Sequence, residues 1–153
     1  MKPIVTIGAD HRGFALKKKA VTFLKSKGYK VKDVGTHSTQ SCDHPEISIK
    51  VAKQASTSKN NRGIMICKTG IGSAIAANKV LGVRAALCYN QKAARLSRQH
   101  NDSNVLVLGS DFVKSRTVGK LLTIWLTTAF EGGRHIKRVN QIKDFEKKTK
   151  KKA

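Results

Sequence analysis

Residues 62–79 read RGIMICKTGIGSAIAANK, an apolar stretch, a glycine-rich turn and a run of small residues in direct succession. The segment GIMIC at 63–67 is typical of a strand that is covered on both faces, and AIAANKVL at 74–81 is typical of a helix. A buried strand followed at once by a helix is the unit from which parallel sheets are built.

The same alternation of strand-like and helix-like stretches continues along the chain from residue 3 to about residue 130. Strands are predicted at 3–9, 29–35, 63–67, 83–89 and 104–109, and helices at 13–28, 45–56, 74–81, 91–100 and 115–130. Because such units are right-handed, the pattern predicts an α/β fold, a three-layer αβα sandwich around a Rossmann-like five-stranded parallel sheet. One domain is expected over 1–142, followed by a basic, lysine-rich, helical tail at 143–153.

The chain is strongly basic, with 31 Lys and Arg against 9 Asp and Glu and a net charge of +22. The last eleven residues hold six lysines and two acids, a net +4, so the other residues carry +18. Such a surface either attracts phosphorylated molecules or simply favours solubility. Nucleic-acid binding is not expected, because aromatic residues make up 5% and no base-stacking motif is present.

No apolar run approaches the roughly 20 residues of a membrane span, and the N-terminus lacks a signal-peptide pattern. Cys42, Cys67 and Cys88 are an odd number of cysteines without paired spacing. This usage is typical of a reduced, cytoplasmic protein and does not fit a disulfide scaffold, a CxxC redox site or a zinc site.

In folds of this class the ligand binds beyond the carboxyl ends of the strands. The turn that follows Cys67 belongs to that edge, where Gly70 and Gly72 allow close approach of an anion and the next helix offers free N–H groups. Its spacing fits neither a dinucleotide fingerprint nor a P-loop. Cys67 is therefore either a thiolate favoured by a helix N-terminus or a small buried hydrophobe.

Two further segments supply candidate residues. Residues 98–102, with His100 among them, lie between a helix and a strand, and we assign them to the same edge of the sheet. His100 is either an acid/base group or a surface residue. Arg134 and Arg138 lie four residues apart on one helical face, where they would bind a phosphate or form a solvated basic face.

Five motifs occur in order over residues 3–142, namely ADHRGFALK, CDHPE, GIMICKTGIGSAIAANKVLGVRAALCYN, SRQHNDSNVLVLG and TTAFEGGRHIKRV. Together they resemble type B ribose-5-phosphate isomerases, a family that includes allose-6-phosphate isomerases and galactose-6-phosphate isomerase subunits. The resemblance implies an aldose–ketose isomerase of the pentose phosphate pathway, working on ribose 5-phosphate through a cis-enediolate. It implies no metal and no cofactor.

The resemblance also implies roles for individual residues. Cys67 would be the base that moves a proton between C1 and C2, and Thr69 would relay a proton between the two oxygens. Asp10 and His100 match the pair that opens the furanose ring. The implied substrate-binding residues are His11, Arg134 and Arg138 for the phosphate, the turn Gly70, Ile71, Gly72 and Ser73 with Asn101 for the enediolate, and Asp43 and His44 at the sugar. In this family the arginine pair comes from a neighbouring subunit, so a homodimer, or a tetramer built from it, with shared sites is expected.

Four residues depart from the family pattern. Lys68 stands where glycine is usual, and it would favour the thiolate or, if the turn requires positive φ, strain it. Asp111 replaces a common arginine and Arg12 a small residue, and we expect these two side chains to pair. His44 stands where tyrosine is typical. The alternatives are an isomerase for another sugar phosphate, such as allose 6-phosphate, or a catalytically weakened homologue that binds polyanions.

Overall fold

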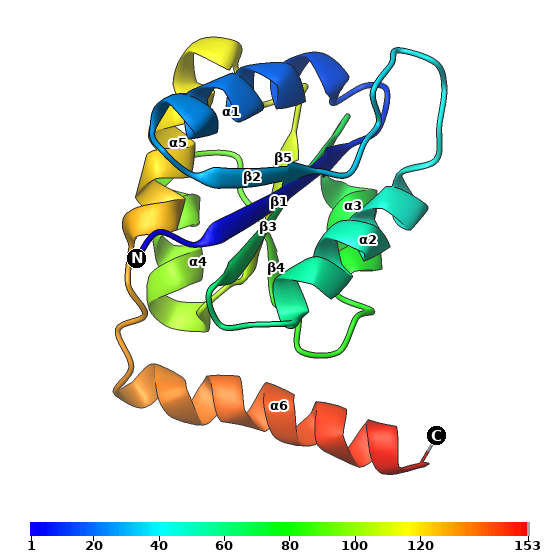
Figure 1. Cartoon of the computed structure of the whole chain (residues 1–153). Coiled ribbons are helices and arrows are strands. Elements are labelled where there is room, and N and C mark those ends of the chain that lie inside the picture. Colours follow the sequence, from blue (N-terminus) through cyan, green and yellow to red (C-terminus); the bar gives the residue numbers. More distant parts are fainter. Residues whose placement is uncertain (153) are drawn as a thin grey trace.

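The computed structural model describes residues 1–152 and contains one five-stranded sheet in which every strand pair is parallel (Figure 1). The strands are β1 (Ile4–Ala9), β2 (Lys30–Asp33), β3 (Asn61–Cys67), β4 (Ala85–Leu87) and β5 (Val105–Gly109). Their order across the sheet is β2-β1-β3-β5-β4. The predicted α/β fold with a parallel sheet is confirmed.

Helices cover both faces of the sheet, which gives the expected three layers (Figure 1). The helices are α1 (Phe14–Ser26), α2 (His44–Ser56), α3 (Ile71–Ala77), α4 (Gln91–Asn101), α5 (Ser115–Thr127) and α6 (Arg134–Lys152). Side chains of α1, α4 and α5 pack in one hydrophobic cluster and those of α2 and α3 in another. The sheet therefore lies between two separate cores.

The central strands explain why the sequence shows continuous apolar runs. In β3, Ile64 and Ile66 point into the cluster with α1, α4 and α5, whereas Met65 points into the cluster with α2 and α3. In β5, Leu106 points into the first of these clusters and Val107 into the second. Because successive side chains alternate between two buried faces, every position along such a strand is apolar.

The edge strand β4 is shorter than the predicted strand at 83–89. It pairs with β5 alone, at Ala85–Leu87. On its open side the Asn78 side chain exchanges two hydrogen bonds of 2.9 Å with the backbone of Ala85. The Asn78 side chain thus makes the hydrogen bonds that a further strand would make. The pattern of apolar residues in the sequence does not predict this role.

The C-terminal helix α6 lies apart from both helical layers, next to the amino ends of β3 and β5 (Figure 1). It is one uninterrupted helix, so the predicted division at residue 142 falls inside it and the lysine-rich segment is its second half. The helical character of this tail is confirmed. Within residues 1–152, none of the helices combines the length and apolar character needed to cross a membrane.

Candidate active site

The carboxyl ends of the three central strands bring several predicted residues together. Cys67 is the last residue of β3 and pairs in register with Gly109 of β5. Asp10 follows β1 directly, one position beyond the pair of Ala9 with Ile66. The loops after these strands therefore meet at one edge, as the fold rule predicts.

The turn after Cys67 is tightly constrained. Gly70 has a φ of +84°, and a Cβ atom there would collide with the side chain of Leu87. Its N–H donates to Cys67 Sγ at 3.2 Å, so the backbone of the turn lies directly against the sulfur. Thr69 Oγ1, two residues from Cys67, accepts from the N–H of Ile71 at 3.3 Å. Only glycine fits the conformation and the space at position 70.

Lys68 does not strain this turn. The one non-glycine residue with positive φ within 1–152 is Asp102, so the backbone at position 68 is open to any side chain. The Lys68 side chain is exposed, and its carbonyl accepts from the N–H of Asp111 at 3.0 Å. The alternative in which Lys68 spoils the turn is therefore wrong.

The Asp10 carboxylate is buried and fixed by the start of α1. Its Oδ1 accepts from the N–H groups of Arg12 and Gly13, each at 2.9 Å. His11, the next residue, lies with its Nδ1 at 3.2 Å from the backbone N and O of Cys42. These contacts hold the loop after β1 against the segment that enters α2.

His44 lies over the start of α3. A Cβ atom on Gly72 would lie 2.6 Å from its Cε1 and Nε2 atoms, so a glycine is needed beneath the ring. Its Nδ1 and the Oγ of Ser73 are buried without a hydrogen-bond partner in the described part of the chain. Asp43, just before α2, is exposed. Two unpartnered polar atoms at the start of α3 mark a place that a ligand or water completes.

The expected pair of Arg12 and Asp111 does not form. Both side chains are exposed, and no ion pair joins them within residues 1–152. Asp111 is held through its backbone in the turn after β5, where its carboxylate faces solvent. The pairing of Arg12 with Asp111 that the sequence predicts is therefore not observed.

The other four predicted residues lie at the opposite edge of the sheet. His100 and Asn101 end α4, which leads into β5, and Arg134 and Arg138 lie on α6 beside that same edge. The assignment of residues 98–102 to the edge of Cys67 is wrong, because a connection from a helix into a parallel strand lies at the amino end of that strand. The length of β5, about 13 Å, separates the two groups.

His100 belongs to a small cluster that the sequence interpretation missed. Its ring stacks on that of His135, with centroids 4.3 Å apart, and the Nε2 atoms of the two histidines lie 3.9 and 3.5 Å from Glu131 Oε2. Burial lowers the pKa of His135, and the positive charges of His100 and Arg134 lower it further. The sequence pattern that could have indicated this cluster is the spacing of Glu131 and His135, which lie four residues apart.

This cluster is also the one group of the described residues with the composition of a metal site. The ligand atoms of His100, Glu131 and His135 lie within 4.8 Å of one another. Arg134 and Arg138 place positive charge next to it, which disfavours a cation.

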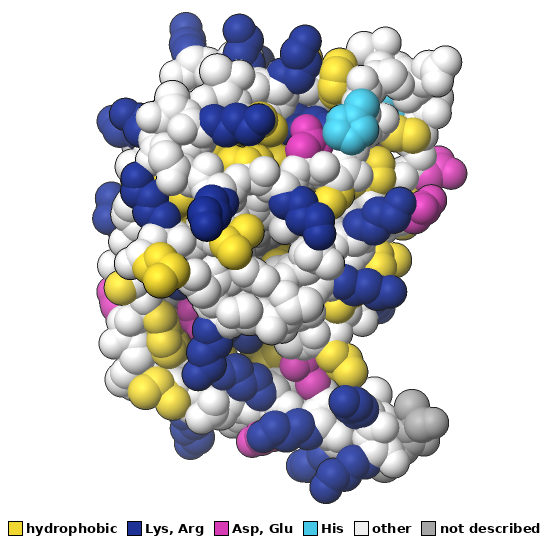
Figure 2. Space-filling model, in the orientation of Figure 1, with side chains coloured by type: hydrophobic (Ala, Val, Ile, Leu, Met, Phe, Trp, Pro, Cys, Tyr) yellow, Lys and Arg dark blue, Asp and Glu magenta, His cyan; other side chains and the backbone are white. Residues whose placement is uncertain are grey.

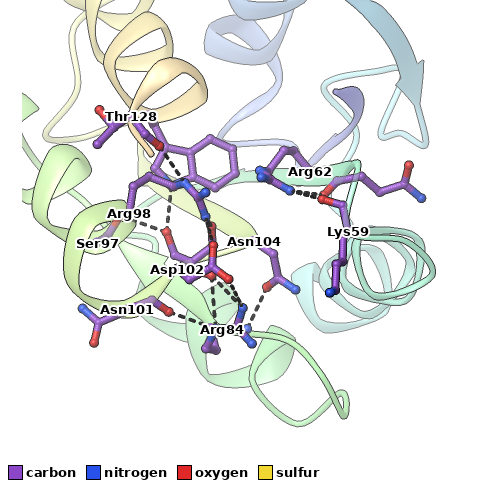
Figure 3. Close-up of polar contacts among 12 residues, drawn as sticks. Lys59, Arg62, Arg84, Ser97, Arg98, Asn101, Asp102, Asn104 and Thr128 are labelled. Carbon is purple, nitrogen blue, oxygen red and sulfur yellow. Dashed lines mark hydrogen bonds and ion pairs between the residues drawn. The ribbon is translucent and has the colours of Figure 1, made fainter. Parts of the chain in front are cut away.

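Two partly buried carboxylates, Asp102 and Asp33, hold the segments around the site through ion pairs. At the amino edge, Arg98 and Arg84 each bind a different oxygen of the Asp102 carboxylate, at 2.8 and 3.0 Å (Figure 3). At the carboxyl edge, the fully buried Lys17 lies 2.6 Å from Asp33 Oδ1 and donates to the carbonyl of Thr36. Sequence reasoning missed Lys17 because its neighbours in α1 are also lysines.

The fold and the carboxyl edge define a doubly wound α/β protein with a buried cysteine beneath a turn of backbone N–H groups. A family model described as Ribose/Galactose Isomerase matches residues 5–142, and the chain belongs to this family. It is 42% identical over 144 residues to ribose-5-phosphate isomerase B of Escherichia coli, covering 94% of this chain and 97% of that one.

Solved structures agree with this assignment. Ribose-5-phosphate isomerase B of Clostridium thermocellum superposes with a TM-score of 0.91 at 47% identity, covering 95% of this chain and 98% of that one. The Mycoplasma genitalium enzyme, whose structure contains bound ribulose-5-phosphate, gives a TM-score of 0.91 at 42% identity, covering 96% and 98%.

Proposed function

We propose that the protein is an aldose–ketose isomerase that interconverts ribose 5-phosphate and ribulose 5-phosphate. The observation that carries the proposal is the buried Cys67, whose sulfur accepts from the N–H of Gly70 in a turn that also holds the unpartnered Oγ of Ser73. Membership of the family and the names of its relatives support the same activity. An enzyme with this activity acts in the pentose phosphate pathway, and we place it in the cytoplasm.

In the proposed reaction Cys67 Sγ takes the proton from C2 of the open-chain aldose and returns it to C1. The intermediate is an enediolate, whose negative oxygen requires donors that are already in position. The N–H groups of Gly72 and Ser73, at the start of α3, supply such donors. Thr69 lies between the sulfur and these donors in the chain, where its hydroxyl would move a proton between O1 and O2.

The sugar must first open from its furanose ring, and we assign this step to Asp10 and His100. Within one chain these residues lie at opposite edges of the sheet, so they cannot act together on one sugar. A second copy of the chain, with its amino edge against the carboxyl edge of the first, would bring His100 and Asn101 to Asp10 and Cys67. We therefore propose a homodimer with two shared sites.

The same arrangement accounts for phosphate binding. His11 would hold the phosphate from one subunit, and the exposed guanidinium groups of Arg134 and Arg138 would reach it from the other. Large apolar side chains on α3 and α6 are available for the contact between subunits, because Ile75 is 59% exposed and Phe145 is 71% exposed.

The activity is tested by measuring ribulose 5-phosphate formation with the full chain and with Cys67→Ala. Removing the base should lower kcat by about a thousandfold or more, while KM changes little because the phosphate contacts remain. Allose 6-phosphate is the comparison substrate and should give a lower kcat/KM. If Cys67→Ala retains full turnover, Cys67 is not the base. If neither sugar reacts, the protein is not an isomerase of this kind.

A further inference from the structure

The His44 ring lies against the turn that carries the proposed donors to the enediolate. A Cβ atom on Gly72 would lie 2.6 Å from both Cε1 and Nε2 of His44, but 3.6 Å from Nδ1. The edge of the ring that contains Nε2 therefore faces Gly72. Because a Cα–Cβ bond in a helix tilts toward the helix N-terminus, this edge lies at the same end of α3 as the N–H groups of Gly72 and Ser73.

The backbone on both sides of His44 is fixed. The His44 carbonyl accepts from Ser48 Oγ at 2.7 Å, and Ser48 is fully buried. Two residues earlier, the backbone N and O of Cys42 lie 3.2 Å from His11 Nδ1. Pro45 follows in the first turn of α2, where its ring restricts the backbone. The imidazole is therefore held over the turn before a substrate arrives, as a preorganised donor must be.

The two ring nitrogens of His44 differ in their surroundings. Nδ1 is buried and has no hydrogen-bond partner in the described part of the chain. A hydrogen on Nδ1 would be left without an acceptor, which is costly for a buried N–H group. The tautomer with its hydrogen on Nε2 instead places the donor at the edge of the ring that faces Gly72. Nε2 also has no partner within residues 1–152, but it is not enclosed, so its N–H can meet a ligand.

Ser73 gives independent evidence that a bound molecule completes this turn. Its side chain is fully buried, and its Oγ has no hydrogen-bond partner among the described residues. A buried hydroxyl without a partner is rare in a folded protein. Two polar side chains from different helices, one over Gly72 and one next to it in the chain, therefore both lack a partner.

We propose that His44 is a further catalytic residue, which donates a hydrogen bond from its Nε2–H to the enediolate oxygen. The inference rests on the proposed function, because it adds a side-chain donor to the backbone N–H groups of the Gly70–Ser73 turn. The hydrogen stays on Nε2, so His44 transfers no proton. The hydrogen bond strengthens as negative charge develops on the oxygen, and it therefore stabilises the transition state more than the bound substrate.

The test is steady-state kinetics of ribose 5-phosphate isomerisation by His44→Phe. Phenylalanine keeps a ring over Gly72 but has no N–H group, so kcat should fall about a hundredfold. Lys and Arg side chains are spread over the surface and attract the phosphate without His44 (Figure 2). KM should therefore change by about threefold or less. Full kcat in the variant would overturn the proposal. A raised KM at unchanged kcat would also overturn it, because His44 would then contact a sugar hydroxyl and not the developing charge.

Two amide variants identify the nitrogen that acts. The amide nitrogen of glutamine lies as many bonds from Cα as Nε2 of histidine, whereas the amide nitrogen of asparagine corresponds to Nδ1. His44→Gln should therefore keep kcat within about tenfold of wild type, and His44→Asn should lose about as much as His44→Phe. Rescue by asparagine and not by glutamine would overturn the assignment of the donor to Nε2.

His37→Phe is the matched control, since His37 lies in the segment that leads to α2 and is exposed. Its kcat should stay within about twofold of wild type, and an equal loss in His37→Phe and His44→Phe would contradict the proposal. Fluorescence of the single, fully buried Trp125 checks that each variant is folded. A wild-type protein that does not turn over ribose 5-phosphate would refute the proposed function itself. An active wild type with an equally active His44→Phe would refute only the role of His44.

Discussion

Cys67 and Cys88 are both nearly inaccessible thiols, but their surroundings differ. Cys67 lies at the end of a strand, with the N–H of Gly70 directed at its sulfur. Cys88 lies in the hydrophobic cluster formed with α1, α4 and α5. Burial raises the pKa of the Cys88 thiol to about 11, and the hydrogen bond with Ser97 opposes this only in part. This difference supports Cys67, and not Cys88, as the proposed base.

The thiol of Cys88 should make stability fall at alkaline pH. Below about pH 9 it is protonated in both the folded and the unfolded chain, so its contribution is fully present. As pH rises from about 9 to about 11 the unfolded thiol ionises first, which lowers the free energy of unfolding by at most about 3 kcal/mol.

The measurement is urea denaturation at about pH 8, 9.5 and 11, monitored by the fluorescence of Trp125. Cys88→Ala is measured in the same way as the comparison. The variant lacks the titrating thiol, so its free energy of unfolding should fall less steeply over this range. Parallel curves for the two proteins would show that Cys88 does not contribute.

Lys17 shows how one helix positions a loop of the candidate site. Its ammonium is buried between Asp33 at the end of β2 and the carbonyl of Thr36, and so fixes the start of the segment that leads to Asp43 and His44. Replacing Lys17 by Met should lower the free energy of unfolding by about 1–3 kcal/mol. The loss is not larger because Asp33 is 30% exposed, so water can solvate its carboxylate.

Lys18→Met is the matched control, since Lys18 is the next residue of α1 and is exposed. Chemical denaturation should separate the two variants clearly. Equal stability would mean that the buried ion pair contributes nothing. A fall in kcat/KM of Lys17→Met without loss of folding would show that the loop is mispositioned.

The elements were largely predictable because each central strand is buried on both faces and reads as an apolar run. Asn78 could not be recognised as the residue that completes the edge of β4, since its role depends on a backbone 7 residues away. The turn at Gly70 could be recognised, because a Gly-x-Gly sequence between a strand and a helix has few other uses. The pair of His135 with His100 could not, as it joins α4 to α6.

At the scale of the whole molecule, the candidate site is divided between the two edges of the sheet. Motif order predicted the residues of the site, but the placement of His100 depended on reading a helix-to-strand connection correctly. Lys143 and Lys147, which composition alone places in a basic tail, line the same space as Arg62 between α6 and the body of the protein. The direction of α6 relative to the sheet is a tertiary property that no local pattern encodes.

The proposed division of the site between two subunits makes a direct prediction about mixed dimers. Cys67→Ala and His100→Ala should each be nearly inactive alone, because in the proposed homodimer every site of either variant lacks one of the two proposed catalytic groups. In a dimer with one subunit of each kind, one site has lost both groups and the other retains both.

The measurement that tests this account most directly is therefore the activity of the two variants after they are unfolded together in equal amounts and refolded. Random pairing gives about half mixed dimers, each with one intact site, so the mixture should regain about a quarter of the wild-type rate by the symmetry of shared sites. If the mixture stays as inactive as its components, His100 and Cys67 do not act across a subunit interface, and the proposed shared site is wrong.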